Sequence, residues 1–255
     1  PQNVHLFISQ SKDFFGMFDA DKRRQKSFDR LVGRLVSRNH QSEDRMAVIE
    51  ELARMDSPEA DAALFRRWDM MADKKREDVA EKEYLADVLS AKGEGVIQHL
   101  KSHNDRSANV TWPLQVLRRI AGDEAVLDEI LRVLTAEQKR LASFKPEKKI
   151  RLLQLLADFE DSRVEAAAII SLSDFDETVR WEAALQLGRV GEEPGCTALI
   201  ERLSHDDEDS LRVRRGIVTA LFERQFKVLD RREELSPHLG DDFRIGPKGT
   251  LIRAD

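Results

Sequence analysis

The chain has little of what β-rich or exported folds require. Its 255 residues include one cysteine, 7 prolines, 12 glycines and 6% aromatic residues. A single cysteine, Cys196, excludes an internal disulfide and is typical of a reducing compartment. No run of about 18 apolar residues occurs, and Asp13, Asp19 and Asp21 stand where an export signal would be basic and then apolar. We therefore expect a cytoplasmic chain with no membrane-spanning helix and no export signal.

Charged residues, by contrast, are abundant and unevenly distributed. They make up 35% of the chain, beside 41% hydrophobic residues, which is the composition of a helix-rich globular protein. The net charge of -6 disfavours a protein devoted to nucleic acid, because phosphate binding depends on Lys and Arg. Residues 1–40 contain eight Lys and Arg against four Asp, so a basic head precedes an acidic body.

Paired apolar helical patterns recur along most of the chain. The first helix of each pair is predicted to start near residues 42, 75, 107, 145, 175 and 208. Such regular spacing is typical of a solenoid, in which each pair buries its apolar face only by stacking on its neighbours. We predict an all-α, right-handed α-solenoid of about five to six helix pairs over residues 41–235. Residues 1–40 would form an N-terminal helical cap, and residues 236–255 a short non-helical tail.

One stretch of the array has a more specific pattern. Residues 176–191 read Asp-Glu-Thr-Val-Arg-Trp-Glu-Ala-Ala-Leu-Gln-Leu-Gly-Arg-Val-Gly. With residues 198–203, they resemble the HEAT-like repeat first described in phycobilisome lyases. The resemblance extends over residues 41–226 and is strongest at 174–226. It implies a solenoid of HEAT-like pairs, in which Arg180 would tether adjacent repeats.

The helix expected after Asp176 is apolar on two sides. Val179, Ala183 and Leu187 form one row at i, i+4 and i+8, as expected of a helix packed between neighbours. The small residues Ala183, Ala184 and Gly188 would allow the adjoining helix to approach closely.

The basic head contains a predicted amphipathic helix from about residue 21 to 38. Apolar side chains from Phe28 to Val36 fall on one side of it. Five basic side chains, which we predict as partner-binding, recur every four residues on the other: Lys22, Lys26, Arg30, Arg34 and Arg38. The simplest interpretation is a terminal cap, whose apolar side covers the first repeat and whose charges face water. The alternatives are a docking surface for an acidic partner, or a weak contact with anionic lipid through the Phe-rich segment before the helix.

The tail and the second helices give two further expectations. Residues 243–252 read as two short extended segments around Gly246-Pro247, either a hairpin or a tail laid over the last repeat. Acidic residues outnumber basic ones on the second helices of the pairs. Among them, Glu124, Asp128 and Glu129 lie on adjoining turns of one predicted helix and are our candidates for a partner-binding concave surface.

Candidate chemistry is weak at every position considered. Cys196 could be activated at a helix start, but it also falls in an apolar row with Leu199 and is interpreted as a small core residue. His99 and His103 are one turn apart, yet spacing supplies no third metal ligand. No phosphate-binding glycine loop or Ser/His/Asp arrangement is recognisable. We therefore predict no enzyme activity, no catalytic or metal site and no cofactor.

The tryptophans open one alternative function. Some HEAT-like proteins hydrolyse alkylated DNA bases with aromatic and acidic side chains in a basic groove. Trp68, Trp112 and Trp181 would suit this function, whereas acidic second helices would not. The prediction is a non-catalytic protein-binding scaffold or adaptor with a concave, largely acidic surface. Its partner is a protein, with neither nucleic acid nor membrane expected beyond weak surface contact through the N-terminal segment. The alternatives are a nucleic-acid-binding or DNA-base-repair HEAT-like protein and a chromophore lyase-like protein.

Overall fold

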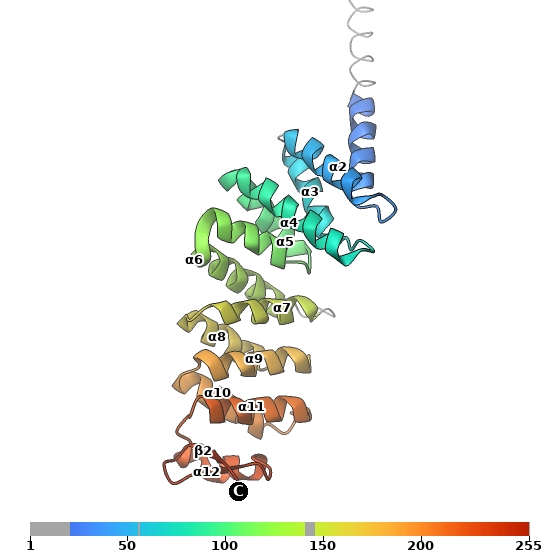
Figure 1. Cartoon of the computed structure of the whole chain (residues 1–255). Coiled ribbons are helices and arrows are strands. Elements are labelled where there is room, and N and C mark those ends of the chain that lie inside the picture. Colours follow the sequence, from blue (N-terminus) through green and yellow to red (C-terminus); the bar gives the residue numbers. More distant parts are fainter. Residues whose placement is uncertain (1–20, 56, 141–145, 255) are drawn as a thin grey trace, which may run out of the picture. The chain divides into compact units, whose positions relative to one another are not determined.

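The computed structural model describes residues 21–55, 57–140 and 146–254. They fold into two compact units, which lie within residues 1–120 (unit 1) and 121–255 (unit 2) (Figure 1). The array expected over residues 41–235 is thus built in two parts. The fold is all-α with a short C-terminal tail, as predicted.

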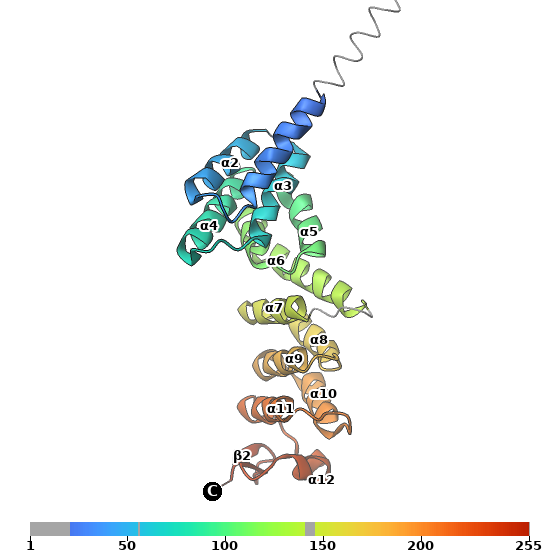
Figure 2. The ribbon, with the colours of Figure 1, turned by 90° about the vertical axis from the view of Figure 1, so that its right-hand side faces the viewer.

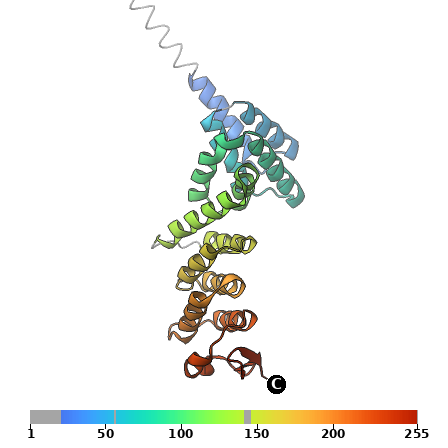
Figure 3. The ribbon, with the colours of Figure 1, turned by 90° about the vertical axis from the view of Figure 1, so that its left-hand side faces the viewer.

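Unit 1 consists of a helix over residues 21–35 and the helix pairs that follow it (Figure 3). These further elements, in chain order, are α2 (Ser42–Arg54), α3 (Pro58–Asp69), α4 (Lys75–Ala91), the short 3-10 helix η1 (Gly93–Val96) and α5 (Ile97–Arg106). Helix α2 packs against α3 and α4, and α3 packs against α5. Helix α6 (Thr111–Gln138) begins in unit 1 and ends in unit 2.

Gly122 divides α6 into two helical segments. Its φ of 80° and ψ of -179° are not helical, and an L side chain rarely adopts such a φ. The two segments of α6 therefore stand where the two helices of a third pair were expected. The second segment starts with Asp123 and Glu124 directly after the break.

Unit 2 continues as two columns of helices. Its elements after α6 are α7 (Glu147–Leu155), η2 (Leu156–Asp158), α8 (Ser162–Ser171), α9 (Glu177–Val190), α10 (Glu193–Ser204), α11 (Leu211–Glu223), η3 (Leu229–Arg231), α12 (Arg232–Leu235), η4 (Ser236–His238), β1 (Phe243–Ile245) and β2 (Leu251–Arg253). Figure 2 shows the first helices α7, α9 and α11 in one column and the second helices α8 and α10 in the other. This is the stacking expected of a solenoid.

The core of unit 2 lies between the two columns. Leu187, Leu199, Leu203 and Leu221 are fully buried there. Gly188 brings α9 close to α11, because a Cβ at this position would lie 2.9 Å from the Cβ of Ala220. The expectation that small residues on α9 permit close packing is confirmed at Gly188.

Side-chain caps fix where several helices begin. The Ser57 hydroxyl accepts a hydrogen bond from the Ala60 N–H, with Pro58 in the first turn of α3. The Asp176 carboxylate accepts from the Thr178 and Val179 N–H groups at the start of α9. The Ser210 hydroxyl accepts from the Val213 N–H at the start of α11. These caps satisfy N–H groups that the helices themselves leave without partners.

Buried ion pairs link successive helix pairs. In unit 2, Arg180 of α9 binds Glu208, which precedes α11, at 2.7 Å. The role that the resemblance implied for Arg180 is confirmed by this pair. Lys149 of α7 binds Asp174, which precedes α9, in the equivalent place one repeat earlier. In unit 1 the fully buried Glu81 of α4 pairs with both Arg45 of α2 and Arg67 of α3, so one carboxylate joins three helices.

The C-terminal residues form a hairpin that lies on the last long helix. Residues Phe243–Ile245 pair antiparallel with Leu251–Arg253. Leu251 is fully buried, and the rings of Phe222 of α11 and Phe243 are 5.3 Å apart. Both expected features, a hairpin and a segment laid over the last repeat, therefore occur together.

The predicted helix starts hold within a few residues. The starts predicted at 42 and 75 match α2 and α4. The helix predicted to start near residue 107 is α6, which begins at Thr111, after a turn in which the Ser107 hydroxyl accepts from the Asn109 N–H. The basic helix ends at residue 35, so the predicted end at 38 is wrong and Arg38 lies in the following turn. The right-handed twist of the array stays a prediction.

Candidate functional site

Acidic residues collect where the second helices of unit 2 begin. Asp161 precedes α8 and accepts a hydrogen bond from the Arg163 N–H at 2.8 Å. Glu192 precedes α10, and Glu124 lies in the first turn after the Gly122 break. Carboxylates are favoured at these positions, because helix N-termini expose N–H groups and carry partial positive charge. The local structure of each helix thus places acids on one edge of the unit.

Arg163 joins the acids of α6 to those of α8. Its guanidinium binds Glu124 and Asp128 of α6, each at 2.8 Å, and Asp161 at 2.9 Å. The hydrogen bonds from Arg163 lower the pKa of Asp161 to about 2. Those to Asp161 and Glu124 in turn raise the pKa of Arg163. Three carboxylates from two helices therefore share one cation.

Glu165 and Arg224 continue the connection to α10 and α11. One Glu165 oxygen accepts from the Glu192 N–H at 2.7 Å and from the Gly195 N–H at 2.9 Å. A Cβ at Gly195 would come 2.8 Å from that oxygen, so this close approach favours glycine. Arg224, directly after the end of α11, binds the Glu192 carboxylate at 2.5 Å and donates to the Gly191 carbonyl at 2.8 Å. Adjacent repeats are thus connected along this edge by charged hydrogen bonds.

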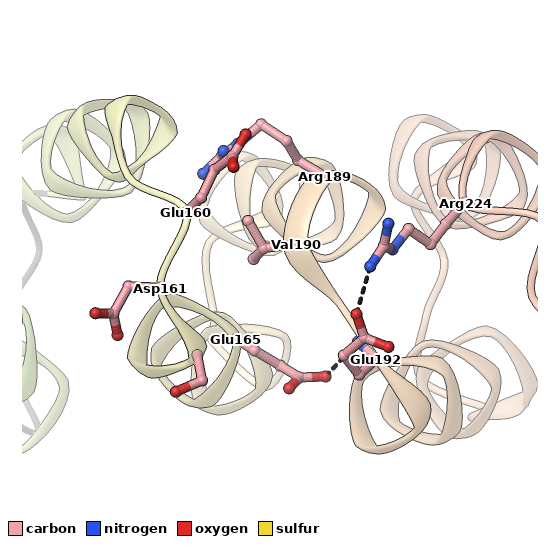
Figure 4. Close-up of a pocket in the computed structure, with 8 residues that line it drawn as sticks. Glu160, Asp161, Glu165, Arg189, Val190, Glu192 and Arg224 are labelled. Atoms are coloured by element: carbon pink, nitrogen blue, oxygen red, sulfur yellow. Dashed lines mark hydrogen bonds and ion pairs between the residues drawn. The ribbon is translucent and has the colours of Figure 1, made fainter.

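A polar hollow lies among these residues (Figure 4). Its volume is about 350 Å³, and its charged lining residues are Glu160, Asp161, Glu165, Arg189, Glu192 and Arg224. Arg189 donates to the carbonyls of Leu156 and Phe159, so its charge is held against the backbone of η2 and the residue that follows it. The hollow therefore presents mainly carboxylates to solvent.

We call six of these carboxylates the acidic stripe: Glu124, Asp128, Glu160, Asp161, Glu165 and Glu192. Three guanidinium groups lie among these six carboxylates, so acids outnumber bases by two to one. The bases are Arg163, Arg189 and Arg224. The side chains of Glu124 and Glu192 are 71% and 73% exposed. The stripe is consequently an accessible, negatively charged surface that crosses α6, α8 and α10.

The structure brings two of the three acidic candidates into this stripe. Glu124 and Asp128 both belong to it, whereas Glu129 is 2% exposed and pairs with Arg132 at 2.8 Å. The inclusion of Glu129 in an exposed surface was therefore wrong. Val126, Leu127 and Ile130 are also buried, and the turn of the helix places Glu129 beside them.

Sequence reasoning missed Asp161, Glu165 and Arg163. Each acid lies at or near the start of a second helix, and that position was the available signal for Asp161. Arg163 is separated in sequence from Asp128 by 35 positions and from Glu124 by 39 positions, so its contacts with them depend on how the repeats stack. The role of Glu165 likewise depends on the approach of α10 to α8.

The five basic candidates lie in unit 1. Lys22, Lys26 and Arg30 are exposed and Arg34 is half-buried on the helix over residues 21–35, while Arg38 is exposed beyond its end. The opposite side of this helix is buried, as predicted, through Leu31, Val32 and Leu35.

Cys196 and His103, two other candidate positions for chemistry, are buried among core side chains. Burial raises the pKa of the Cys196 thiol to about 11, which disfavours the reactive thiolate. His103 is buried beside the rings of Phe65 and Trp68. Across the described ranges, no group of three or more His, Cys, Asp or Glu side chains is placed to hold a metal ion.

The tryptophans differ in their surroundings. Trp68 is buried in α3, and its indole N–H donates to the Lys82 carbonyl. Trp181 of α9 is partly buried, with the Arg212 guanidinium 3.9 Å from its ring centroid. It also lies against α11, since a Cβ at Gly216 would come 2.8 Å from Trp181 Cδ1. Both rings therefore contribute to helix packing.

Comparison with known proteins finds one similarity, which covers part of unit 2. Residues 138–221 match the family model of HEAT repeats, and these residues include α7 to α10 and most of α11. A search of the curated proteins finds no match. Within the described part of the chain, no helix has both the length and the apolar character needed to cross a membrane.

Proposed function

We propose that this chain, whose residues 138–221 match the family model of HEAT repeats, is a non-catalytic scaffold that binds another protein through the acidic stripe of unit 2. The observation that supports the proposal most directly is the two-to-one excess of carboxylates over guanidinium groups along the stripe. Such a surface attracts a basic segment and orients its approach. The reducing cytoplasm, to which Cys196 is suited, is the compartment that we propose for this activity.

The repeat architecture supports the same proposal. Three hydrogen bonds hold carboxylates of successive repeats in place. Arg163 donates to Glu124, the Gly195 N–H donates to Glu165, and Arg224 donates to Glu192. A surface fixed in this way needs little rearrangement to bind an extended or helical segment. Because most of its charges are exposed, we expect them to accelerate encounter and to make binding sensitive to salt.

The test uses matched baits in affinity capture. The stripe variant carries Glu124→Gln, Asp128→Asn and Glu192→Gln, which removes three negative charges with little change in side-chain size. The control variant carries Glu147→Gln, Glu177→Gln and Glu223→Gln, which are exposed acids on the first helices of unit 2. Proteins recovered with each bait would be identified by mass spectrometry and then titrated as purified partners.

We expect a basic protein to bind the wild type and the control variant, with affinity that falls as salt rises. The stripe variant should bind it at least tenfold more weakly, a loss of about 1.4 kcal/mol. Equal binding by all three baits would exclude the stripe as the site. Recovery of nucleic acid in place of protein would favour the nucleic-acid alternative, and activity on a chromophore would favour the lyase alternative.

A further inference from the structure

A row of cations on the N-terminal helix has no acidic partner among the described residues. The row consists of Lys22, Lys26, Arg30 and Arg34, which recur every four residues on the helix over residues 21–35. Figure 1 shows the first half of this helix projecting from unit 1, and residues 21–27 are all exposed. This part of the helix is therefore accessible from several sides.

The row costs the isolated helix some stability. Like charges at i and i+4 repel by a few tenths of a kcal/mol per pair. A helical segment that is polar on all sides also gains little from burial. Binding of a negatively charged surface along the row would relieve the repulsion and support the exposed turns.

The row and the acidic stripe have similar lengths. From Lys22 to Arg34 the helix rises by about 18 Å, at about 1.5 Å per residue. The stripe crosses α6, α8 and α10, and two helix-to-helix spacings of about 8–10 Å give roughly 16–20 Å. One helix laid across the starts of three second helices could therefore place its cations beside carboxylates of each repeat.

We propose that the cation row of one copy of this chain binds the acidic stripe of a second copy. The inference rests on the proposed function of the stripe and names its occupant. Leu31, Val32 and Leu35 are buried within unit 1, so the contact is made by charged side chains and is sensitive to salt. It joins different surfaces on the two copies, so a copy with both surfaces intact can continue the assembly.

Two variants separate the two surfaces. The row variant carries Lys26→Gln, Arg30→Gln and Arg34→Gln and keeps its stripe. The stripe variant carries Glu124→Gln, Asp128→Asn and Glu192→Gln and keeps its row. Sedimentation velocity gives the mass of each protein near 0.01 M salt, where charges act over about 30 Å, and near 1 M salt, where they act over about 3 Å. Circular dichroism melting checks that both variants are folded.

At low salt we expect the wild type to gain mass with concentration and to return to one copy at high salt. Each variant alone should remain a single copy, because each lacks one of the two surfaces. An equimolar mixture should form a one-to-one dimer and stop there, because only one functional row and one functional stripe meet. The Glu147→Gln, Glu177→Gln, Glu223→Gln control should associate like the wild type.

A wild type that stays a single copy at low salt would overturn the inference, as would a mixture that does not dimerise. Association that persists in the row variant alone would also overturn it. Loss of binding to duplex DNA or anionic vesicles in the row variant, without self-association of the wild type, would assign the row to those ligands instead. If the copies do not associate but the stripe still captures a basic protein, this inference fails and the proposed function stands.

Discussion

At the scale of single residues, Glu208 of unit 2 is a buried carboxylate held by several donors. It is fully buried and accepts charged hydrogen bonds from Arg180 at 2.7 Å and from Arg202 at 2.8 Å. The Ser210 N–H donates to it as well. One carboxylate thereby connects α9, α10 and the start of α11, so its charge affects three helices.

Glu208→Gln should destabilise the protein substantially. The substitution keeps the size of the side chain but leaves the buried Arg180 guanidinium without its anion, while Arg202 keeps only the exposed Asp207 carboxylate at 3.1 Å. Removing one partner of a buried ion pair typically costs about 3–5 kcal/mol. Urea denaturation would measure the loss. The neighbouring Asp209→Asn is the control, because Asp209 is exposed and its change should stay within about 0.5 kcal/mol. A loss below about 1 kcal/mol for Glu208→Gln would contradict the expectation.

The same carboxylate predicts how stability depends on pH. Burial alone would raise the pKa of Glu208, but hydrogen bonds from Arg180, Arg202 and the Ser210 N–H outweigh it and hold the pKa below its ordinary value. A lowered folded-state pKa stabilises the protein above the unfolded pKa of about 4.3, and this contribution is lost as pH falls through the folded value.

Denaturant melts of the wild type and Glu208→Gln should show this loss. Their difference in unfolding free energy should be constant from pH 7 to about pH 5 and should shrink as pH falls below about 4.3. Glu81 in unit 1, whose pKa is also lowered, remains in both proteins, so subtraction isolates Glu208. A difference that does not change between pH 5 and the acid transition would show that Glu208 is not the titrating group.

At the scale of helices, α9 and α11 are in contact because Gly188 has no side chain. A Cβ at Gly188 would lie 2.9 Å from the Ala220 Cβ and 3.1 Å from the Ala220 Cα. Part of that obstacle is backbone, so rotation of a side chain cannot remove it. The helices must separate to accommodate even one added methyl group.

Gly188→Ala should therefore destabilise the protein, although alanine is the better helix former. Overpacking typically costs about 1–3 kcal/mol, against a gain of up to about 1 kcal/mol in helix propensity. Thermal and urea denaturation would measure the balance. Adding Ala220→Gly removes the nearest atom and should restore part of the packing. A single variant as stable as the wild type would show that the two helices can move apart freely.

The helices were more predictable than the contacts between them. Apolar periodicity depends only on local sequence, and it placed α2 and α4 at their observed starts. The burial of Glu129 was not predicted, because its register against neighbouring helices decides which side of α6 faces the core. The Arg163 contacts with Glu124 and Asp128 need the same register. Thus the sequence was sufficient to predict an acidic surface that includes Glu124 and Asp128, whereas the place of Glu165 in it depends on how the repeats stack.

At the scale of the whole molecule, contacts run mainly between neighbouring repeats. In unit 2, α9 packs against α7, α8 and α11, and the hairpin strand β2 packs against α11. Stability in such an array is approximately a sum of repeat and nearest-neighbour contributions. A local defect should therefore weaken its own repeat and the adjoining ones more than distant ones.

Leu221→Ala offers a direct test of this behaviour. Leu221 is fully buried in α11, so truncation should cost about 2–5 kcal/mol. Hydrogen exchange followed by mass spectrometry should show the largest loss of protection in α11 and the hairpin, a smaller loss in α9 and α10, and the smallest loss in α7. Glu223→Ala, an exposed change in the same helix, is the control and should alter little. Equal loss of protection from α7 to the hairpin would mean that unit 2 opens as one cooperative block, because a nearest-neighbour array confines the defect to the repeats beside it.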